Sequence, residues 1–187
     1  MLALALGILG LTACVPHSRS PLSSPEKAVI DQRLVGAWSG LIGKNRAFAH
    51  FIDRGESHME IVFISFAKEE RDEWLVFSMF TSVIGNDRYM NVKLSVERRE
   101  IFAEKDRAYI PCRYSIGKDG KLRIWTMSPT TVAADIKAGL ITGTKKGTGF
   151  TSDLILTADT ARLRKYVVGT GPARVFGELL VTLGRIQ

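Results

Sequence analysis

Residues 109–126, YIPCRYSIGKDGKLRIWT, decide the fold class of this chain. Apolar and polar residues alternate over 108–116 and again over 121–126. A two-residue period is typical of β-strands that bury one face. The polar, glycine-containing segment 117–120 closes a hairpin between them, so the two strands are expected to pair antiparallel.

Further strands are predicted on both sides of this hairpin. β-branched and aromatic residues, separated by polar turns, mark strands at 34–42, 47–52, 59–66, 74–83, 90–96 and 154–156. The 59–66 segment is nearly all apolar, so we expect it to be buried on both faces. A meander of about seven strands must close or stack to remove its edges. The sequence therefore predicts a mainly β domain, either an antiparallel barrel or a sandwich.

Two short helices are expected in the second half of the chain. Ser128 can cap a helix over 129–138, with Gly139 just past its end. A second helix is expected over about 158–167, with Thr157 as its cap. Between them, 143–149 is predicted to be a flexible basic loop. The apolar tail 175–183 could form a strand or a helix, of which we prefer the helix.

Composition is that of an ordinary globular protein with one domain. The chain has 187 residues, of which 45% are hydrophobic and 24% charged. No run of about 18 apolar residues occurs, so no transmembrane helix is predicted. The net charge of +7 attracts anionic partners. The basic residues are spread thinly along the chain. We therefore expect first a solvated surface without a specific partner and second a contact with anionic lipid or glycan, and we expect no binding to nucleic acid.

The amino-terminal segment has the features of a secretory signal. Residues 2–11 form an apolar run that is too short to span a bilayer. The next residues, Leu11-Thr12-Ala13-Cys14, resemble the lipobox of bacterial lipoproteins. The resemblance implies a diacylglycerol thioether on Cys14, cleavage before it, and acylation of the new terminus, for example by palmitate. Two or three acyl chains anchor a protein where one would not.

The same resemblance predicts the domain organisation and the location. Residues 1–13 would be the signal peptide, 14–27 a lipidated tether rich in Ser and Pro, and 28–187 the folded domain. Because Val15 follows the cysteine, the outer membrane is favoured, with the domain facing the periplasm or the cell surface. No basic residue precedes the apolar run, so we expect the true start to lie upstream of Met1.

Gly36-Ala37-Trp38 opens the first predicted strand and resembles the Gly-x-Trp signature of the lipocalins and related calycins. In that family the tryptophan closes one end of an antiparallel barrel. A basic side chain from near the end of the chain packs on its indole as a cation–π contact. The resemblance implies this role for Arg162, Arg164 or Arg174.

The sequence gives little support for a metal site or for a catalytic nucleophile. Cys112 falls on the apolar face of its strand and is predicted to be a small core residue. His50 and His58, with Glu60, could meet in a hairpin, but a zinc site would need further ligands, so we prefer two surface histidines. The 143–149 segment only superficially resembles a phosphate loop. We therefore expect no enzyme activity, no cofactor and no metal.

Two functions stay open. The first is a non-catalytic, membrane-anchored lipoprotein that binds a small apolar or amphipathic molecule in a β-barrel, with Trp38, Tyr89, Arg113 and Tyr114 as the candidate ligand-binding residues. The alternative is a structural lipoprotein that docks on another envelope protein without a ligand cavity.

Overall fold

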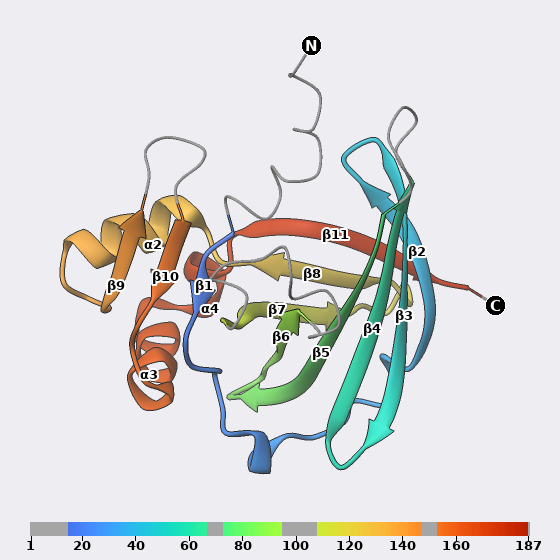
Figure 1. The fold of residues 1–187 in the computed structure, drawn as a ribbon, viewed down its shortest axis with the longest axis horizontal. Helices are drawn as coiled ribbons and strands as arrows, with labels where there is room; N and C mark the ends of the chain where they lie inside the picture. The colour runs from blue at the N-terminus through green and yellow to red at the C-terminus, as the bar shows by residue number, and fades with distance from the viewer. Residues whose placement is uncertain (1–14, 67–72, 95–107, 147–152, 187) are drawn as a thin grey trace.

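The fold is a closed barrel of eight antiparallel strands with a smaller layer of helices and strands beside it (Figure 1). The computed structural model describes residues 15–66, 73–94, 108–146 and 153–186. Around the barrel the strands follow the order β11, β2, β3, β4, β5, β6, β7, β8. The barrel strands are β2 (Gly36–Ile42), β3 (Asn45–Gly55), β4 (His58–Phe66), β5 (Glu73–Ile84), β6 (Asp87–Leu94), β7 (Ile110–Ile116), β8 (Leu122–Thr126) and β11 (Glu178–Arg185). Of the two predicted architectures, the barrel is confirmed.

The last strand, β11, closes the barrel by pairing with β8 on one side and β2 on the other. The prediction of a helix over 175–183 is therefore wrong. Val181 and Leu183 alternate with Thr182 and Gly184, and this two-residue period puts the two apolar side chains inside. Within the predicted stretch only Val175 is helical, as the last residue of the four-residue helix α4 (Pro172–Val175).

Strand β4 departs from its prediction on one face. Met59 and Ile61 point into the barrel and are buried. The outer face is not covered, because Val62 and Ile64 are only partly buried and Phe66 is 41% exposed. The expectation that 59–66 is buried on both faces is wrong.

The second layer packs on the outside of the barrel and has its own core. It contains α2 (Pro129–Lys137), α3 (Thr160–Thr170), α4 and a small sheet in the order β1 (His17–Ser18), β10 (Asp153–Leu156), β9 (Gly143–Lys146). Tyr89 of β6 and Trp125 of β8 belong to this core together with Phe176. The helical layer therefore covers the outer face of these barrel strands.

Helix α2 begins as predicted, but two neighbouring predictions fail. The Ser128 side chain accepts a hydrogen bond from the Thr131 backbone N–H, as expected of its cap. The cap of α3 is Asp159, which accepts from the Arg162 N–H at 2.8 Å, and not Thr157. The carboxylate of Asp159 is a better acceptor here than the hydroxyl of Thr157, because a negative charge is stabilised at a helix N-terminus. Residues 143–146 form strand β9 instead of a loop, because they pair with β10; 147–149 lie outside the described residues.

The expected tether packs against the folded body. His17 and Ser18 pair with β10 in parallel, and Leu22 is fully buried in the core of the helical layer. The backbone N–H of Leu22 donates to Asn91 Oδ1 at 2.7 Å, and Asn91 donates in turn to Ser82. Residues 16–23 therefore belong to the domain, and the prediction of a free spacer over 14–27 is wrong for this stretch.

No helix in the described parts of the chain has the length and apolar character needed to cross a bilayer.

Candidate functional site

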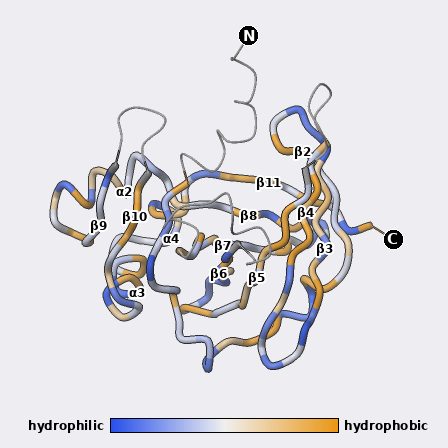
Figure 2. The backbone as a smooth tube through the Cα atoms, viewed as in Figure 1, coloured by the Kyte–Doolittle hydropathy of each residue, from blue (hydrophilic) through white to orange (hydrophobic). Residues whose placement is uncertain are grey.

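The interior of the barrel is an apolar site built by alternation along each strand. Its fully buried side chains are mainly aromatic residues and methionines, among them Trp38, Phe51, Met59, Met79 and Met90. Figure 2 shows long hydrophobic stretches along β3 and β4. An eight-stranded barrel is just wide enough to be filled by side chains or to hold one small ligand. The two ends of this barrel differ, and they are described in turn.

Trp38 and Arg185 close one end, which we call the Trp38 end. The indole Nε1–H of Trp38 donates to the Leu34 carbonyl at 2.7 Å, and the Arg185 guanidinium lies 4.5 Å from the centre of the indole ring system. Arg185 also donates to the carbonyls of Val35, at 2.8 Å, and Arg33. The basic residue over the tryptophan is therefore Arg185, and the expectation of Arg162, Arg164 or Arg174 is wrong.

Gly36 is needed for this arrangement. Its φ is +118°, a backbone conformation that residues other than glycine rarely adopt. A Cβ at this position would lie 2.9 Å from Arg185 Nη1. The glycine of the Gly-x-Trp sequence thus leaves room for the arginine.

A buried carboxylate, Asp31, secures the same end. The Tyr114 hydroxyl donates to it at 2.9 Å, Arg33 donates at 2.8 and 2.9 Å, and Arg88 lies 3.4 Å away. Burial opposes the ionisation of Asp31, but the hydrogen bonds from Arg33 and Tyr114 outweigh it and lower its pKa from 3.8 to about 2. Asp31 is therefore ionised and ties the amino-terminal segment to β7.

At the opposite end, which we call the far end, β2, β4 and β6 finish and β3, β5 and β7 begin. The inward-facing apolar side chains here include Ile42, Phe63, Phe77 and Ile110, and they are only partly buried. By contrast Trp38, Phe51 and Met59 are at most 1% exposed. Among the described residues, the apolar interior is thus closed at the Trp38 end and less completely buried toward the far end.

The four predicted ligand-binding residues do not form one site. Trp38 and Tyr114 lie inside the barrel at the Trp38 end. Tyr89 and Arg113 face each other across β6 and β7 on the outer side. Arg113 pairs with Asp87 at 2.7 Å and stacks on Trp125, and burial raises the pKa of Tyr89 to about 12. Sequence alternation alone could have separated these two pairs, since adjacent strand residues face opposite ways.

The other candidate residues are Cys112 on β7 and the two histidines, His50 on β3 and His58 on β4. Cys112 is buried in the barrel core as predicted, and burial raises the pKa of its thiol to about 12. His50 pairs with Val62 and His58 with Gly55. Among the described residues no group of three or more His, Cys, Asp or Glu side chains could hold a metal ion. Cys14 lies outside the described residues.

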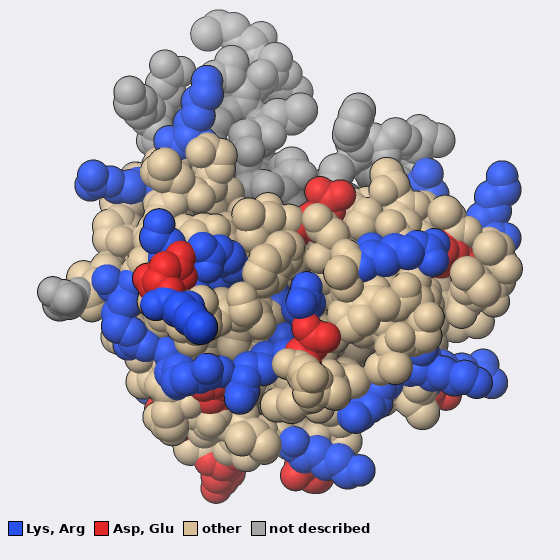
Figure 3. All heavy atoms as spheres, turned by 180° about the vertical axis from the view of Figure 1, so that it is seen from behind, with Lys and Arg blue, Asp and Glu red and all other residues tan. Residues whose placement is uncertain are grey.

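A surface pocket lies on the helical layer and was missed from the sequence. It has a volume of about 530 Å³ and is lined in part by Arg162, Lys165, Tyr166 and Arg174. Figure 3 shows that Lys and Arg outnumber Asp and Glu on the face turned away from the view of Figure 1. The charge of Arg174 is already engaged, since it and Tyr166 both donate to the buried Asp135. Because Asp135 is buried and accepts from both Arg174 and Tyr166, we assign these two residues a structural role.

Fold and site define a class: a small antiparallel β-barrel with an apolar interior, closed at one end and lined at the other by partly buried apolar side chains. In comparisons with known proteins, no family model matches the chain, and neither the curated proteins nor the solved structures give a significant match.

Proposed function

We propose that this protein is a non-catalytic envelope lipoprotein whose barrel takes up a small apolar or amphipathic molecule through its far end. The observation that carries the proposal is the difference between the two ends. Trp38, Arg185 and Asp31 close one end, whereas Ile42, Phe63 and Phe77 at the other are only partly buried. Ligand sites are concave and mostly apolar, and barrel mouths are common places for them.

The lipid anchor in this proposal rests on Leu11-Thr12-Ala13-Cys14. Because Pro16, His17 and Ser18 are buried against the body, acyl chains on Cys14 would hold the barrel close to the membrane. We propose the outer membrane as its location, with Val15 after the cysteine as the supporting feature.

The alternative, docking on another envelope protein, has one observation in its favour. The outer face of β4 is apolar and uncovered at Ile64 and Phe66. A protein that only docked would not need an accessible interior, so the two functions differ in what a block inside the barrel would do.

Ligand binding is tested with the fluorescent apolar probe N-phenyl-1-naphthylamine. Phe63 points inward near the far end, and the next residue, Ile64, points outward. We expect Phe63→Arg to weaken probe binding at least about tenfold, because a cation replaces apolar surface. The matched variant Ile64→Arg should bind as the parent does, with folding of both checked by circular dichroism. Equal binding by the two variants would reject a ligand inside the barrel.

Anchoring is tested separately by mass spectrometry of the mature chain. We expect an amino-terminal Cys14 carrying a diacylglycerol thioether and an added acyl group, and no lipid in Cys14→Ser. A mature chain that keeps residues 1–13, or that has a free thiol at position 14, would contradict the anchor.

A further inference from the structure

An apolar surface spans four strands on the outside of the barrel at the far end. Leu41, Phe66 and Trp74 are 60%, 41% and 50% exposed. Phe48 and Ile64 lie between them and are partly buried, and the rings of Phe48 and Phe66 are 5.6 Å apart, edge to face. We call these five residues the edge patch.

The strand register makes the edge patch continuous. Phe48, Ile64 and Trp74 are direct cross-strand neighbours on β3, β4 and β5. In the adjoining row, Leu41 pairs with Arg46 and Arg46 with Phe66. Direct neighbours lie about 5 Å apart, so Phe48, Ile64 and Trp74 form one row, whereas Arg46 separates Leu41 from Phe66 in the next row. Contiguous exposed apolar surface marks an interaction site more often than single exposed residues do.

Positive charge lies within and beside the edge patch. Arg46 stands between Leu41 and Phe66 in its row, and Lys44 occupies the tip of the hairpin between β2 and β3; both are exposed. Long basic side chains next to Trp, Phe and Leu are typical of surfaces that lie on a membrane, because the apolar groups enter the lipid while the cations remain among anionic headgroups.

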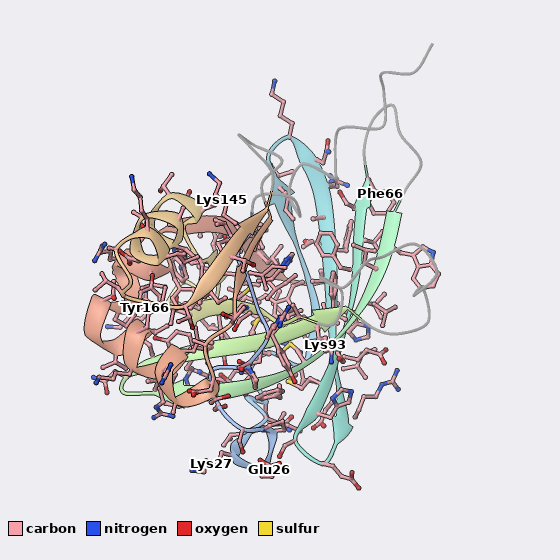
Figure 4. The ribbon with its side chains drawn as sticks, turned by 60° about the vertical axis from the view of Figure 1, so that its left-hand side comes forward. Glu26, Lys27, Phe66, Lys93, Lys145 and Tyr166 are labelled. Carbon is pink, nitrogen blue, oxygen red and sulfur yellow. The ribbon has the colours of Figure 1, made fainter. Side chains whose placement is uncertain are left out.

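The edge patch lies at the end of the molecule where the described chain begins. In Figures 1 and 4, which share a vertical axis, the β2–β3 hairpin lies in the upper part, and so does Phe66 in Figure 4. Lys145 lies there too, whereas Glu26 and Lys27 lie at the bottom of Figure 4. Ser18, near the start of the described chain, exchanges two backbone hydrogen bonds with Tyr109, which directly precedes β7 at the far end. Since residues 16–18 are packed on the body, a lipid attached at position 14 has almost no spacer.

We propose that the edge patch rests on a bilayer surface containing anionic lipid, with the far end of the barrel turned toward that bilayer. The orientation rests on the lipid anchor proposed above, whereas the contact itself is made by the described side chains. An apolar molecule could then pass between the bilayer and the barrel interior without crossing water.

The test uses the full chain with Cys14→Ser in every arm, so that residues 1–14 contribute equally throughout and no lipid is attached. Binding is measured to vesicles of phosphatidylcholine, with or without phosphatidylglycerol. We expect the double variant Leu41→Ser, Phe66→Ser to bind the mixed vesicles about tenfold more weakly than its parent. The control pair Val29→Ser, Ile186→Ser removes side chains of 60% and 42% exposure elsewhere and should bind as the parent does.

The charge is tested by reversing it. Lys44→Glu with Arg46→Glu should reduce the preference for phosphatidylglycerol, and the exposed pair Lys118→Glu, Lys121→Glu serves as the control. A second readout is independent of how strongly residues 1–14 bind. Emission from Trp74, isolated by comparison with Trp74→Phe, should be quenched by brominated lipid, because Trp38 is buried and Trp125 is largely covered.

Each outcome decides the proposal. Equal vesicle binding by the patch variant and its control, together with unquenched Trp74, would overturn it and leave a protein as the occupant of the patch. Because the lipid is absent from every arm, such a failure would not count against the anchor, which the mass of the mature chain tests separately.

Discussion

Trp38 and Arg185 are separated by 147 positions in the chain, yet they form one unit at the sealed end of the barrel. The tryptophan offers an aromatic face, and the arginine covers it while bonding to two backbone carbonyls. A planar guanidinium suits both tasks, since it stacks and donates in a fixed fork.

Arg185→Met tests this unit, because methionine keeps the apolar stem and removes the charge and the donors. We expect a loss of about 1–2 kcal/mol in the free energy of unfolding. Urea denaturation measures it. Arg162→Met is the control, since Arg162 is largely exposed and makes only a loose pair with Asp159, at 3.9 Å. Equal effects of the two variants would mean that Arg185 does not stabilise the sealed end.

Asp31 predicts a dependence of stability on pH. Its pKa falls from 3.8 to about 2 on folding, so its contribution is complete above pH 4 and is lost as the pH falls through about 2. The contribution is about 2 kcal/mol. We therefore expect Asp31→Asn to flatten the fall in unfolding free energy between pH 5 and pH 2, measured by urea denaturation at several pH values.

Asp119 is the matched control for this experiment. Hydrogen bonds from Arg123 and from the Lys121 backbone also lower its pKa to about 2, but its side chain is 43% exposed. Water screens such a pair, so Asp119→Asn should change the acid dependence far less. If both variants behaved alike, burial of Asp31 would not be the cause.

At the scale of elements, the amino-terminal segment is the most informative. Its serines and prolines indicate an extended spacer, and an extended backbone is indeed what pairs with β10 as β1. Composition did not predict that the segment packs on the domain. The packing depends largely on two interactions, the burial of Leu22 and the hydrogen bond from its backbone N–H to Asn91.

Leu22→Ala tests whether the segment is part of the domain. Removing a fully buried leucine leaves a cavity, and we expect a loss of about 2–4 kcal/mol in unfolding free energy. Val29→Ala, at a side chain 60% exposed, should change it by less than about 0.5 kcal/mol. A neutral Leu22→Ala would instead support the spacer that the sequence suggests.

At the scale of the whole molecule, closure of the barrel depends on β11. It follows three helices and the small outer sheet in the chain, and it enters between β8 and β2. Without it both neighbours would present unpaired edges, which favour aggregation.

A chain truncated after Gly177 should therefore fail to unfold cooperatively and should aggregate. A chain lacking only Gln187 keeps every residue of β11 and should melt as the parent does. Thermal denaturation followed by circular dichroism, with light scattering, distinguishes the two. A cooperative transition in the truncated chain would show that β2–β8 fold without closure.

The sequence by itself determined what local patterns control. Two-residue alternation and strand-forming residues located β2 to β8 but not β11, the Ser128 cap predicted the start of α2, and Gly36 with Trp38 marked the first barrel strand. These features depend on neighbours along the chain, so they can be recognised without a fold.

Only the tertiary structure decided between barrel and sandwich, placed Arg185 on Trp38, docked Leu22, and left the outer face of β4 uncovered. Each of these depends on which distant segment reaches a given surface. The local sequence around Phe66 is the same whether a helix or a bilayer covers this side chain. Local sequence therefore cannot specify which partner covers it.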